Sequence, residues 1–339
     1  MSKIRLGTFN CENLFLRYKF NGPLVRHKKG ESGEDYQKRK QAARRKALVE
    51  FDQTGGPLDW LNRELEDFSS TSHTQRRATA AVIAENDPDI IALVEVESME
   101  ALRKFNTKKF FGGKTFGYQI LIDGTDPRGI DVALLSKFPI VHVRSYIDDW
   151  YKTNGKEVRT FSRDCLVARV EIDGKPLTLF INHLKSQYQD DPARRTKQAT
   201  RVAEIVKDTF GKDISTAYFA VVGDFNQTPD DKSLEPLLKA DWNTDVLALA
   251  NVEQSERWTH VFEKNKKVQG VSQLDYILLS KALASKLAGP PVIERRGLAR
   301  YDGLNKYYPD SEERILPSVN GPGTEASDHC PVFVDLQIS

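Results

Sequence analysis

Residues 217–226 read AYFAVVGDFN, a nearly continuous apolar run that ends in two polar side chains. The length of this run and its β-branched and aromatic residues are typical of a β-strand. Because its apolar residues do not alternate with polar ones, we expect both faces of the strand to be buried. Asp224 and Asn226 are two residues apart, so their side chains point to one side of an extended chain. Gly223 allows the close backbone approach that a substrate would need.

Seven other segments have the same strand-like character. They are residues 3–9, 88–97, 129–136, 165–172, 176–183, 274–280 and 330–338. Helical periodicity is found at 74–86 and at 192–210, and shorter helices are expected at 233–240 and 281–288. Strands and helices do not alternate strictly along the chain. This order favours β-sheets packed together with helices outside them.

The composition is that of an ordinary globular protein. The 339 residues are 39% hydrophobic and 29% charged. The start, MSKIRLGTFN, has no apolar segment typical of a signal peptide, and no apolar run reaches the roughly 18 residues that span a membrane. Three cysteines without a CxxC predict neither a disulfide framework nor a zinc ribbon. We therefore expect a cytosolic protein that does not associate with membranes.

The charge of the chain is unevenly distributed. The net charge is +2, yet residues 16–50 hold eleven Lys or Arg against four acidic residues, a local charge of +7. Such a segment indicates a polyanionic partner, although a solvated helix face explains it equally well. We expect one domain over residues 1–339, with this basic insertion at about 17–73 and a long aperiodic loop at about 288–326.

Polar side chains accompany the other strand-like segments too. They are Asn10, Glu95, His183, Asp275, Asp328 and His329. Burying an unpaired charge beside an apolar strand is costly, and one shared site at a rim of the sheets would explain all of them. The oxygens of Asn10, Glu95 and Asp328 suit Mg²⁺ or Mn²⁺. Hydrolysis of a phosphodiester needs such an ion, a group that activates water, and a cation or donor for the developing charge.

Six fragments, in a compatible order, resemble the endonuclease/exonuclease/phosphatase (deoxyribonuclease I-like) superfamily. They are GTFNCENLF (7–15), ALVEVE (92–97), NHLKS (182–186), GDFNQTP (223–229), LDYILLS (274–280) and SDHCPV (327–332). The resemblance implies an α/β fold, a four-layer α/β/β/α sandwich of two mixed β-sheets with outer helices. It also implies a Mg²⁺- or Mn²⁺-dependent hydrolase in which water attacks phosphorus in line.

The resemblance assigns roles to the residues of the expected metal and histidine positions. Glu95 resembles the main metal-binding glutamate, with Asn10 and Asp328 in or near the metal shell. His329 resembles the histidine that contacts the scissile phosphate, and Asp275 resembles the carboxylate that orients this histidine.

Further roles follow for the water and phosphate contacts. Asp224 resembles the residue that positions or deprotonates the attacking water, and Asn226 the amide that holds the phosphate. His183 matches the second histidine of the deoxyribonuclease-like branch, and Arg163 resembles its phosphate-binding arginine. Asp131, in RGIDVALLS, orients His183 or contacts substrate, although a plain strand-edge aspartate explains it equally well. The remaining histidines, including His260, have no motif context and are expected on the surface or in packing.

Departures from the family pattern narrow the expected activity. Val94 stands where the family usually has Gln, and LFINH (179–183) lacks the tyrosine of abasic-site endonucleases. LDY replaces the CDR signature of inositol phosphatases. No exposed aromatic hairpin, which a membrane-acting sphingomyelinase would need, is evident. The closest resemblance is to bacterial non-specific deoxyribonucleases.

We therefore expect a metal-dependent DNA endonuclease with low sequence specificity that acts on nucleic acid as a monomer. An exonuclease or an AP-type DNA repair nuclease is an alternative. So is a phosphatase or phosphodiesterase acting on a small-molecule or lipid phosphoester. A non-catalytic binding module is a third hypothesis, and the complete set of site residues argues against it.

Overall fold

The computed structural model describes residues 2–15, 28, 30–39, 41–43, 73–126, 128–153, 155–249, 252–309, 316, 317, 319 and 323–338. Contacts divide the chain into two compact units, Met1–Leu14 with His73–Ser339, and Phe15–Ser72. In the second unit, residues 33–39 and 41–43 are helical. Most of the basic insertion expected at 17–73 lies outside the described residues. Within the described part, no helix is long and apolar enough to cross a membrane.

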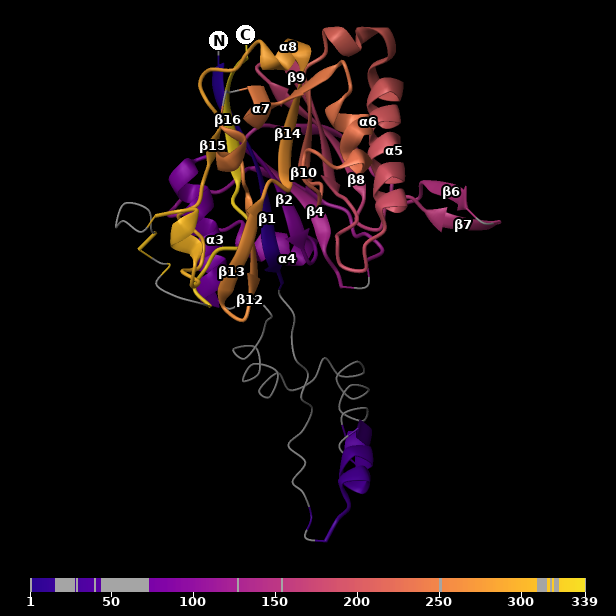
Figure 1. Ribbon diagram of the computed structural model, residues 1–339, viewed down its shortest axis with the longest axis vertical. Coiled ribbons are helices and arrows are strands. Elements are labelled where there is room, and N and C mark those ends of the chain that lie inside the picture. The colour runs from indigo at the N-terminus through magenta and orange to yellow at the C-terminus, as the bar shows by residue number, and fades with distance from the viewer. Residues whose placement is uncertain are drawn as a thin grey trace. The chain divides into compact units, whose positions relative to one another are not determined.

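One six-stranded sheet of the first unit combines the two ends of the chain. Its order is β15-β16-β1-β2-β4-β3. The strands are β1 (Ser2–Leu14), β2 (Ile90–Val96), β3 (Tyr118–Leu121), β4 (Asp131–Ser136), β15 (Val292–Ile293) and β16 (Val332–Ile338). Only β1 and β2 pair in parallel. α3 (His73–Asn86) and α4 (Met99–Phe105) pack on its outer face (Figure 1).

The second six-stranded sheet comes from the middle of the chain. Its order is β11-β14-β10-β9-β8-β5. The strands are β5 (Ile140–Arg144), β8 (Cys165–Ile172), β9 (Lys175–His183), β10 (Phe219–Asp224), β11 (Asn243–Asp245) and β14 (Asp275–Ser280). Only β9 and β10 pair in parallel. The long helix α5 (Pro192–Phe210) covers its outer face (Figure 1).

Alternation along each central strand builds the layers. In β2, Ile90, Ala92 and Val94 enter the core between the sheets, whereas Ile91 and Leu93 pack toward the helices. In the same way, β10 sends Ala220 and Val222 inward and Phe219 and Val221 toward α5. Both faces of the central strands are thus buried, as the unbroken apolar runs predict. The result is the expected four-layer sandwich, with helices outside two mixed sheets.

Short elements connect these layers. The helical ones are η1 (Gly211–Ser215), η2 (Lys232–Leu234), α6 (Glu235–Leu238), α7 (Val246–Leu249), η3 (Gln254–Glu256), α8 (Lys281–Ala284) and η4 (Leu304–Lys306). The pair β12 (His260–Lys264) and β13 (Lys267–Ser272) forms a hairpin immediately before β14. This hairpin lies near the end of the sandwich at which β1 and β2 finish (Figure 1).

A second hairpin, β6 (Trp150–Thr153) with β7 (Lys156–Arg159), projects beside α5 (Figure 1). The Trp150 side chain is 50% exposed, and the guanidinium of Arg159 lies 4.6 Å from the centre of its ring. The expectation that no exposed aromatic hairpin is present was therefore wrong. The sequence contains the signal, because Asn-Gly at 154–155 between two short β-prone segments is typical of a hairpin turn.

Candidate active site

Three of the predicted site residues form one row across the second sheet. The parallel pairing of β10 with β9 places Asp224 opposite His183, and its antiparallel pairing with β14 places Asp224 opposite Asp275. Strand register alone therefore brings these three residues side by side. Gly223 precedes the row with φ +129°, and an added Cβ there would clash with the Asn182 carbonyl oxygen. The close approach at Gly223 is made by β9, so the interpretation that it admits a substrate was wrong.

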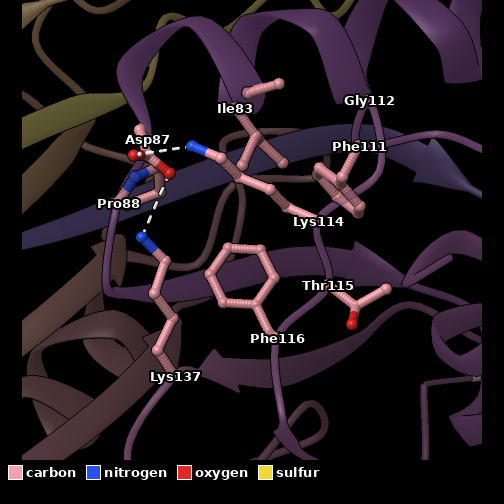
Figure 2. A pocket seen from close by; sticks show the side chains of 10 residues that line it. Ile83, Asp87, Pro88, Phe111, Gly112, Lys114, Thr115, Phe116 and Lys137 are labelled. Atoms are coloured by element: carbon pink, nitrogen blue, oxygen red, sulfur yellow. Dashed lines mark hydrogen bonds and ion pairs between the residues drawn. The ribbon is translucent and has the colours of Figure 1, made fainter. Parts of the chain in front are cut away.

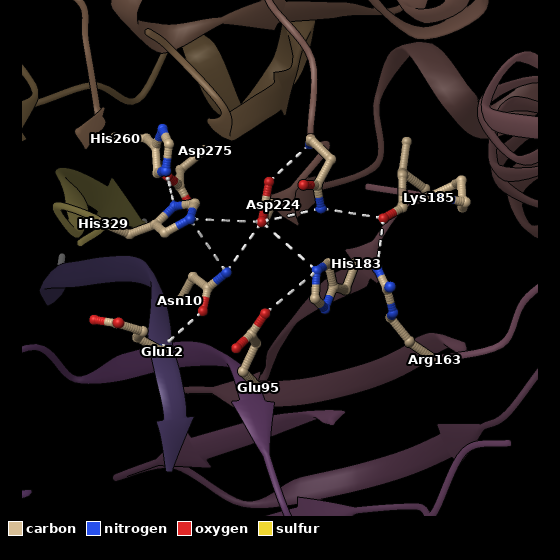
Figure 3. Close-up of polar contacts among 12 residues, drawn as sticks. Asn10, Glu12, Glu95, Arg163, His183, Lys185, Asp224, His260, Asp275 and His329 are labelled. Carbon is tan, nitrogen blue, oxygen red and sulfur yellow. Dashed lines mark hydrogen bonds and ion pairs between the residues drawn. The ribbon is translucent and has the colours of Figure 1, made fainter. Parts of the chain in front are cut away.

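The Asp224 carboxylate is the centre of the site (Figure 3). Its Oδ2 accepts hydrogen bonds from Asn10 Nδ2 at 3.0 Å and from Asn226 Nδ2 at 3.1 Å. Its Oδ1 accepts from the Asn226 backbone N at 2.7 Å, a contact helped by the left-handed φ of Asn226, 55°. Burial raises the pKa of Asp224 to about 7. This carboxylate is thus able to take up a proton near neutral pH.

His329 approaches Asp224 from the segment that leads into β16. Its Nε2 lies 3.9 Å from Asp224 Oδ2, and its Nδ1 lies 2.7 Å from Asp275 Oδ2. Thr259 Oγ1 donates to the same Asp275 oxygen at 2.8 Å. Burial opposes a charged imidazole, but the charges of Asp275 and Asp224 outweigh it and hold the pKa of His329 well above its usual value. His329 is therefore a cation held against two carboxylates.

His183 lies on the opposite side of Asp224, at the end of β9. Its Nε2 is 3.6 Å from Asp224 Oδ2 and 3.9 Å from Glu95 Oε1 (Figure 3). Its Nδ1 is buried without a hydrogen-bond partner among the described residues. Burial and the charge of Arg163 hold the pKa of His183 well below its usual value. His183 is therefore neutral.

Arg163 is buried behind His183 and contacts protein groups. Its Nε donates to Asp126 Oδ2 at 2.9 Å, and its Nη1 donates to the Leu184 carbonyl oxygen at 2.8 Å. The same carbonyl accepts from Asn226 Nδ2 at 3.1 Å, so it links the arginine to the site amide. Within the described structure these contacts position Arg163 close to the row of His183, Asp224 and Asp275.

Asp131 stands apart from the row. It is buried, and its Oδ1 accepts a hydrogen bond from the Gly124 backbone N at 2.8 Å. The loop that begins at Gly124 also carries Asp126, the carboxylate paired with Arg163. Asp131 therefore supports the loop behind Arg163, and no contact between Asp131 and His183 is found in the described structure.

Glu12 and Glu95 lie close enough to Asp328 to feel its charge. Asp328 N donates to Glu12 Oε2 at 2.9 Å, and Asn13 N donates to Glu95 Oε2 at 3.1 Å. Burial, together with the charge of Asp328, raises the pKa of Glu12 to about 9 and also raises that of Glu95. A divalent cation would relieve this repulsion, and hard oxygen ligands suit Mg²⁺ or Mn²⁺. Glu12, Glu95 and Asp328 thus offer the donor type that the predicted ion needs, although among the described residues they do not form a group whose ligand atoms lie within 4.8 Å of one another.

Asn10, expected in or near the metal shell, is engaged within the protein at both ends of its amide. Nδ2 donates to Asp224, and Oδ1 accepts from the Glu12 backbone N at 3.0 Å. Ser327 Oγ donates to the Asn10 carbonyl oxygen at 2.7 Å, which ties β1 to the segment before β16. In this arrangement Asn10 orients the Asp224 carboxylate.

Two groupings of described residues have ligand atoms close enough to share an ion. In each, the ligand atoms lie within 4.8 Å of one another, and the groups are Asp224, Asp275, His329 and His260, Asp328, His329. The first is a possible metal site, although the 2.7 Å contact between His329 Nδ1 and Asp275 is already a hydrogen bond.

Sequence reasoning missed three residues of the site, Glu12, Thr259 and His260. Glu12 belongs to the quoted fragment GTFNCENLF, so its position was within reach. Thr259 and His260 are brought to the site by the hairpin before β14, and no local pattern marks them. The His260 ring lies 4.6 Å from that of His329, and its Nε2 lies 3.7 Å from Asp328 Oδ2. The expectation of an ordinary surface or packing histidine therefore misses its contact with the site.

A separate cavity of about 220 Å³, here called the outer pocket, lies at the opposite end of β2. Ile83, Phe111 and Phe116 form much of its wall (Figure 2). At its rim, Asp87 pairs with Lys114 and Lys137, each at 3.0 Å. None of its described lining residues belongs to the row of His183, Asp224 and Asp275.

Comparisons with known proteins agree with this architecture. The structure resembles that of truncated TDP2 from Caenorhabditis elegans, with a TM-score of 0.54 and 17% identity over 78% of this chain and 90% of that one. It also resembles a mannosyl-6-phosphatase of Bacteroides thetaiotaomicron, with a TM-score of 0.57 and 15% identity over 99% of this chain and 100% of that one. At these identities the likeness shows the fold alone.

Sequence comparison is more specific. No curated protein matches the chain. A sequence model of the "Endonuclease/Exonuclease/phosphatase family" matches residues 68–337. This range includes every strand from β2 to β15, most of β16, and the row of His183, Asp224 and Asp275. The chain therefore belongs to the endonuclease/exonuclease/phosphatase family, whose members act on phosphoesters.

Proposed function

We propose that the protein is a metal-dependent phosphodiesterase that hydrolyses DNA with little sequence preference. The observation that carries this proposal is the position of Asp224, whose Oδ2 lies within 4 Å of both His183 and His329. One imidazole is neutral and the other is cationic, so the same carboxylate is flanked by two different kinds of group. Such a site can handle both the proton of a water molecule and the charge of a phosphate.

Each group has a definite part in this proposal. Asp224 orients the attacking water and accepts its proton, because its pKa of about 7 suits a base at neutral pH. His329 offers positive charge and a donor to the phosphoryl oxygens. Asn226 and Asn10 hold the Asp224 carboxylate in place. A divalent ion bound by the nearby carboxylates would supply Lewis acidity to the phosphate.

DNA as the substrate is supported by charge. Residues 16–50 hold eleven basic and four acidic residues, a positive charge that suits a polyanionic substrate. Binding of DNA through such a segment weakens steeply as the salt concentration rises. His183 adds to this, since it matches the second histidine of the deoxyribonuclease-like branch. Exonuclease or AP-type repair activity would use the same groups.

A phosphatase acting on a small phosphoester is the second candidate. One observation favours it, because a protein of similar fold over 99% of this chain is named a mannosyl-6-phosphatase. This candidate predicts turnover of sugar phosphates and indifference to DNA.

Cleavage of covalently closed circular double-stranded DNA tests the proposal. The protein is incubated with the circle and Mg²⁺ or Mn²⁺, in parallel with EDTA, with Asp224→Ala and with Asp87→Ala. Asp87 is a matched control, since it is an acidic residue of the outer pocket, away from the row. We expect metal-dependent nicking by the wild-type protein and by Asp87→Ala, and none by Asp224→Ala.

The other outcomes separate the candidates. An intact circle, with cleavage of linear or single-stranded DNA, would establish an exonuclease or end-specific enzyme. If all DNA survives while sugar phosphates are hydrolysed, the phosphatase replaces the nuclease. Equal nicking by Asp224→Ala would overturn the assignment of the site.

A further inference from the structure

Arg128 is an exposed arginine that has no part in the chemistry described above. It stands three residues before the start of β4, and 53% of its side-chain surface is exposed. Arg163, the arginine expected to bind phosphate, is only 4% exposed and donates from two of its guanidinium nitrogens to protein groups. Of the two, Arg128 has the side chain that an incoming substrate can more easily reach.

Asp126 joins these two arginines. Its Oδ1 accepts a hydrogen bond from Arg128 Nε at 3.2 Å, and its Oδ2 accepts one from Arg163 Nε at 2.9 Å. Burial opposes the charge of Asp126, but the hydrogen bonds from the two arginines outweigh burial and lower its pKa to about 2. One carboxylate thus holds two guanidinium groups, and the trio keeps an excess positive charge.

The loop that carries Arg128 is fixed by neighbouring backbone and side chains. Thr125 N donates to the Ser162 carbonyl oxygen at 2.7 Å, and Gly124 N donates to Asp131 Oδ1 at 2.8 Å. At Gly124 an added Cβ would lie 2.6 Å from Asp131 Oδ1 and 2.8 Å from the Ser162 carbonyl oxygen. The loop therefore packs closely against its surroundings and gives Arg128 a defined position.

A chain of hydrogen bonds links the loop to the row of site residues on β9, β10 and β14. Arg163 Nη1 donates to the Leu184 carbonyl oxygen at 2.8 Å, and Asn226 Nδ2 donates to the same oxygen at 3.1 Å. The Asn226 amide also donates to Asp224 Oδ2 at 3.1 Å. The arginines and their shared carboxylate are thus positioned relative to the row by direct contacts.

The charge of Arg128 acts on two groups of the site. Burial is the main cause of the lowered pKa of His183, and nearby positive charges, Arg128 among them, lower it further. Arg128 also opposes the rise that burial and the charge of Asp328 produce in the pKa of Glu95. Since Glu95 lies beside His183, Arg128 supplies positive charge on the side of the row where the imidazole is neutral.

Depth separates Arg128 from the groups that act on the scissile phosphate. Asp224 and His183 are 1% and 4% exposed, whereas more than half of the Arg128 side chain is exposed. Its Nε and Nη2 face Asp126, at 3.2 and 3.4 Å, and Nη1 is left for a further acceptor. An arginine placed in this way has donors for a phosphate outside the row.

We propose that Arg128 binds a phosphate that flanks the scissile one in an extended nucleic-acid strand. The inference rests on the proposed phosphodiesterase function and specifies its substrate class, because a sugar monophosphate has no second phosphate to offer. A guanidinium recognises phosphate by charge and by directed hydrogen bonds. Arg128 thereby favours a strand with several phosphates over a small phosphoester.

Two hexathymidylates with the same bases and sugars test the inference. One carries five phosphodiesters, and the other carries a single central phosphodiester between neutral methylphosphonate linkages. Hydrolysis of each strand is measured as kcat/KM, with Mg²⁺ or Mn²⁺, for the wild-type protein and for Arg128→Ala. We expect the substitution to lower kcat/KM for the five-phosphate strand roughly tenfold more than for the single-phosphate strand, which offers no flanking charge.

Salt dependence separates a phosphate contact from a structural role. Fluorescence anisotropy in EDTA measures the affinity for the labelled five-phosphate strand at several salt concentrations. Each phosphate contact to a single strand contributes roughly 0.7 to the slope of log affinity against log salt. The slope should therefore become shallower by about this amount in Arg128→Ala. Arg128→Lys, which keeps the charge, should retain most of the slope.

Arg169→Ala is the matched control. Arg169 is also an exposed arginine, in β8, and its partner on β9 is Thr178, which lies five residues before His183. The control substitution removes the same charge away from the row. It should change neither the ratio of kcat/KM values for the two strands nor the salt slope.

The outcomes distinguish this inference from the proposed function. Equal losses on the two strands, or a loss with an unchanged salt slope, would overturn the inference and leave the phosphodiesterase intact. Arg128 would then act on the scissile phosphate or through Asp126. If the wild-type protein hydrolyses neither strand, the proposed function fails, and the anisotropy measurement decides about Arg128. A weaker affinity and a shallower slope in Arg128→Ala would support the flanking contact, and unchanged values would overturn it.

Discussion

The two buried histidines on either side of Asp224 differ in charge although they share a neighbour. His183 and His329 both approach the same carboxylate oxygen, at 3.6 and 3.9 Å. Burial lowers the pKa of both imidazoles. His329 also has Asp275 at 2.7 Å, whereas His183 has the cation of Arg163 nearby and an Nδ1 without a partner in the described part of the chain. The surrounding charges, and not the depth of burial, decide which histidine carries a proton.

This difference gives the site a polarity. The segment before β16 contributes the positive imidazole, and β9 contributes the neutral one. Asp224 lies between them, at the end of β10. A phosphate that binds here meets a charged donor on one side and an uncharged group on the other. Substitutions at Asp224, Asp275 and Thr259 each alter one contributor to this contrast, and a fourth, at Asp131, tests the effect of burial outside the row.

Removal of the shared carboxylate should have the largest effect. Asp224→Ala takes away the proton acceptor and one of the two anions beside His329. Loss of a positioned acid or base reduces turnover by roughly 10²–10⁴-fold. Initial rates on bis(p-nitrophenyl) phosphate measure this, with circular dichroism as the control for folding. Near-normal rates in the variant would contradict the assignment of Asp224 as the proton acceptor between the two histidines.

Removal of the partner that distinguishes His329 should have the next largest effect. Asp275→Asn keeps the shape but deletes the charge that raises the pKa of His329. Loss of such an orienting partner costs roughly 10–100-fold in activity. Because the pKa of His329 falls, activity should decline at a lower pH than in the wild-type protein. A pH profile of kcat measures both effects, and an unshifted alkaline limb would show that Asp275 does not control the protonation of His329.

A smaller effect is expected at Thr259, which holds Asp275. Thr259→Val removes the hydroxyl that donates to Asp275 Oδ2 at 2.8 Å while keeping a similar volume. One net hydrogen bond of about 0.5–1.5 kcal/mol corresponds to a change of roughly 2–13-fold. We expect kcat to fall within this range with little change in KM. Thr259→Ser, which retains the hydroxyl, should recover most of the rate, and failure of this rescue would mean that Thr259 acts through packing.

Asp131 tests how burial changes the pKa of a carboxylate that has no strong attraction to a nearby cation. Burial raises its pKa to about 7, against an ordinary value of 3.8. Between about pH 4 and pH 7 the folded protein thus holds a proton that the unfolded chain releases, so the free energy of unfolding should fall as pH rises. The Asp131→Asn variant should lack this fall in the free energy of unfolding with rising pH. Urea unfolding across this range compares the two proteins, and parallel pH dependences would contradict the raised pKa.

Much of the fold follows from the sequence, because apolar runs such as AYFAVVGDFN report burial directly. Motif order also indicated His183, Asp224 and Asp275, which the strand register of β9, β10 and β14 brings together. Contacts that depend on hairpins were harder to predict from the sequence. Thr259 reaches Asp275 only because β12 and β13 fold back before β14, and no local pattern encodes that approach. The orientation of the Asn10 amide toward Asp224 likewise depends on two sheets meeting.

The candidate site can form only after β1 has paired with β16. Ser2 pairs with Ile338, so β1 remains unpaired on this side until β16 has been made (Figure 1). Asn10 emerges from the ribosome long before Asp328 and His329. At about 5–20 residues per second, this delay is roughly 15–65 seconds. During this interval the growing chain holds only part of the candidate site.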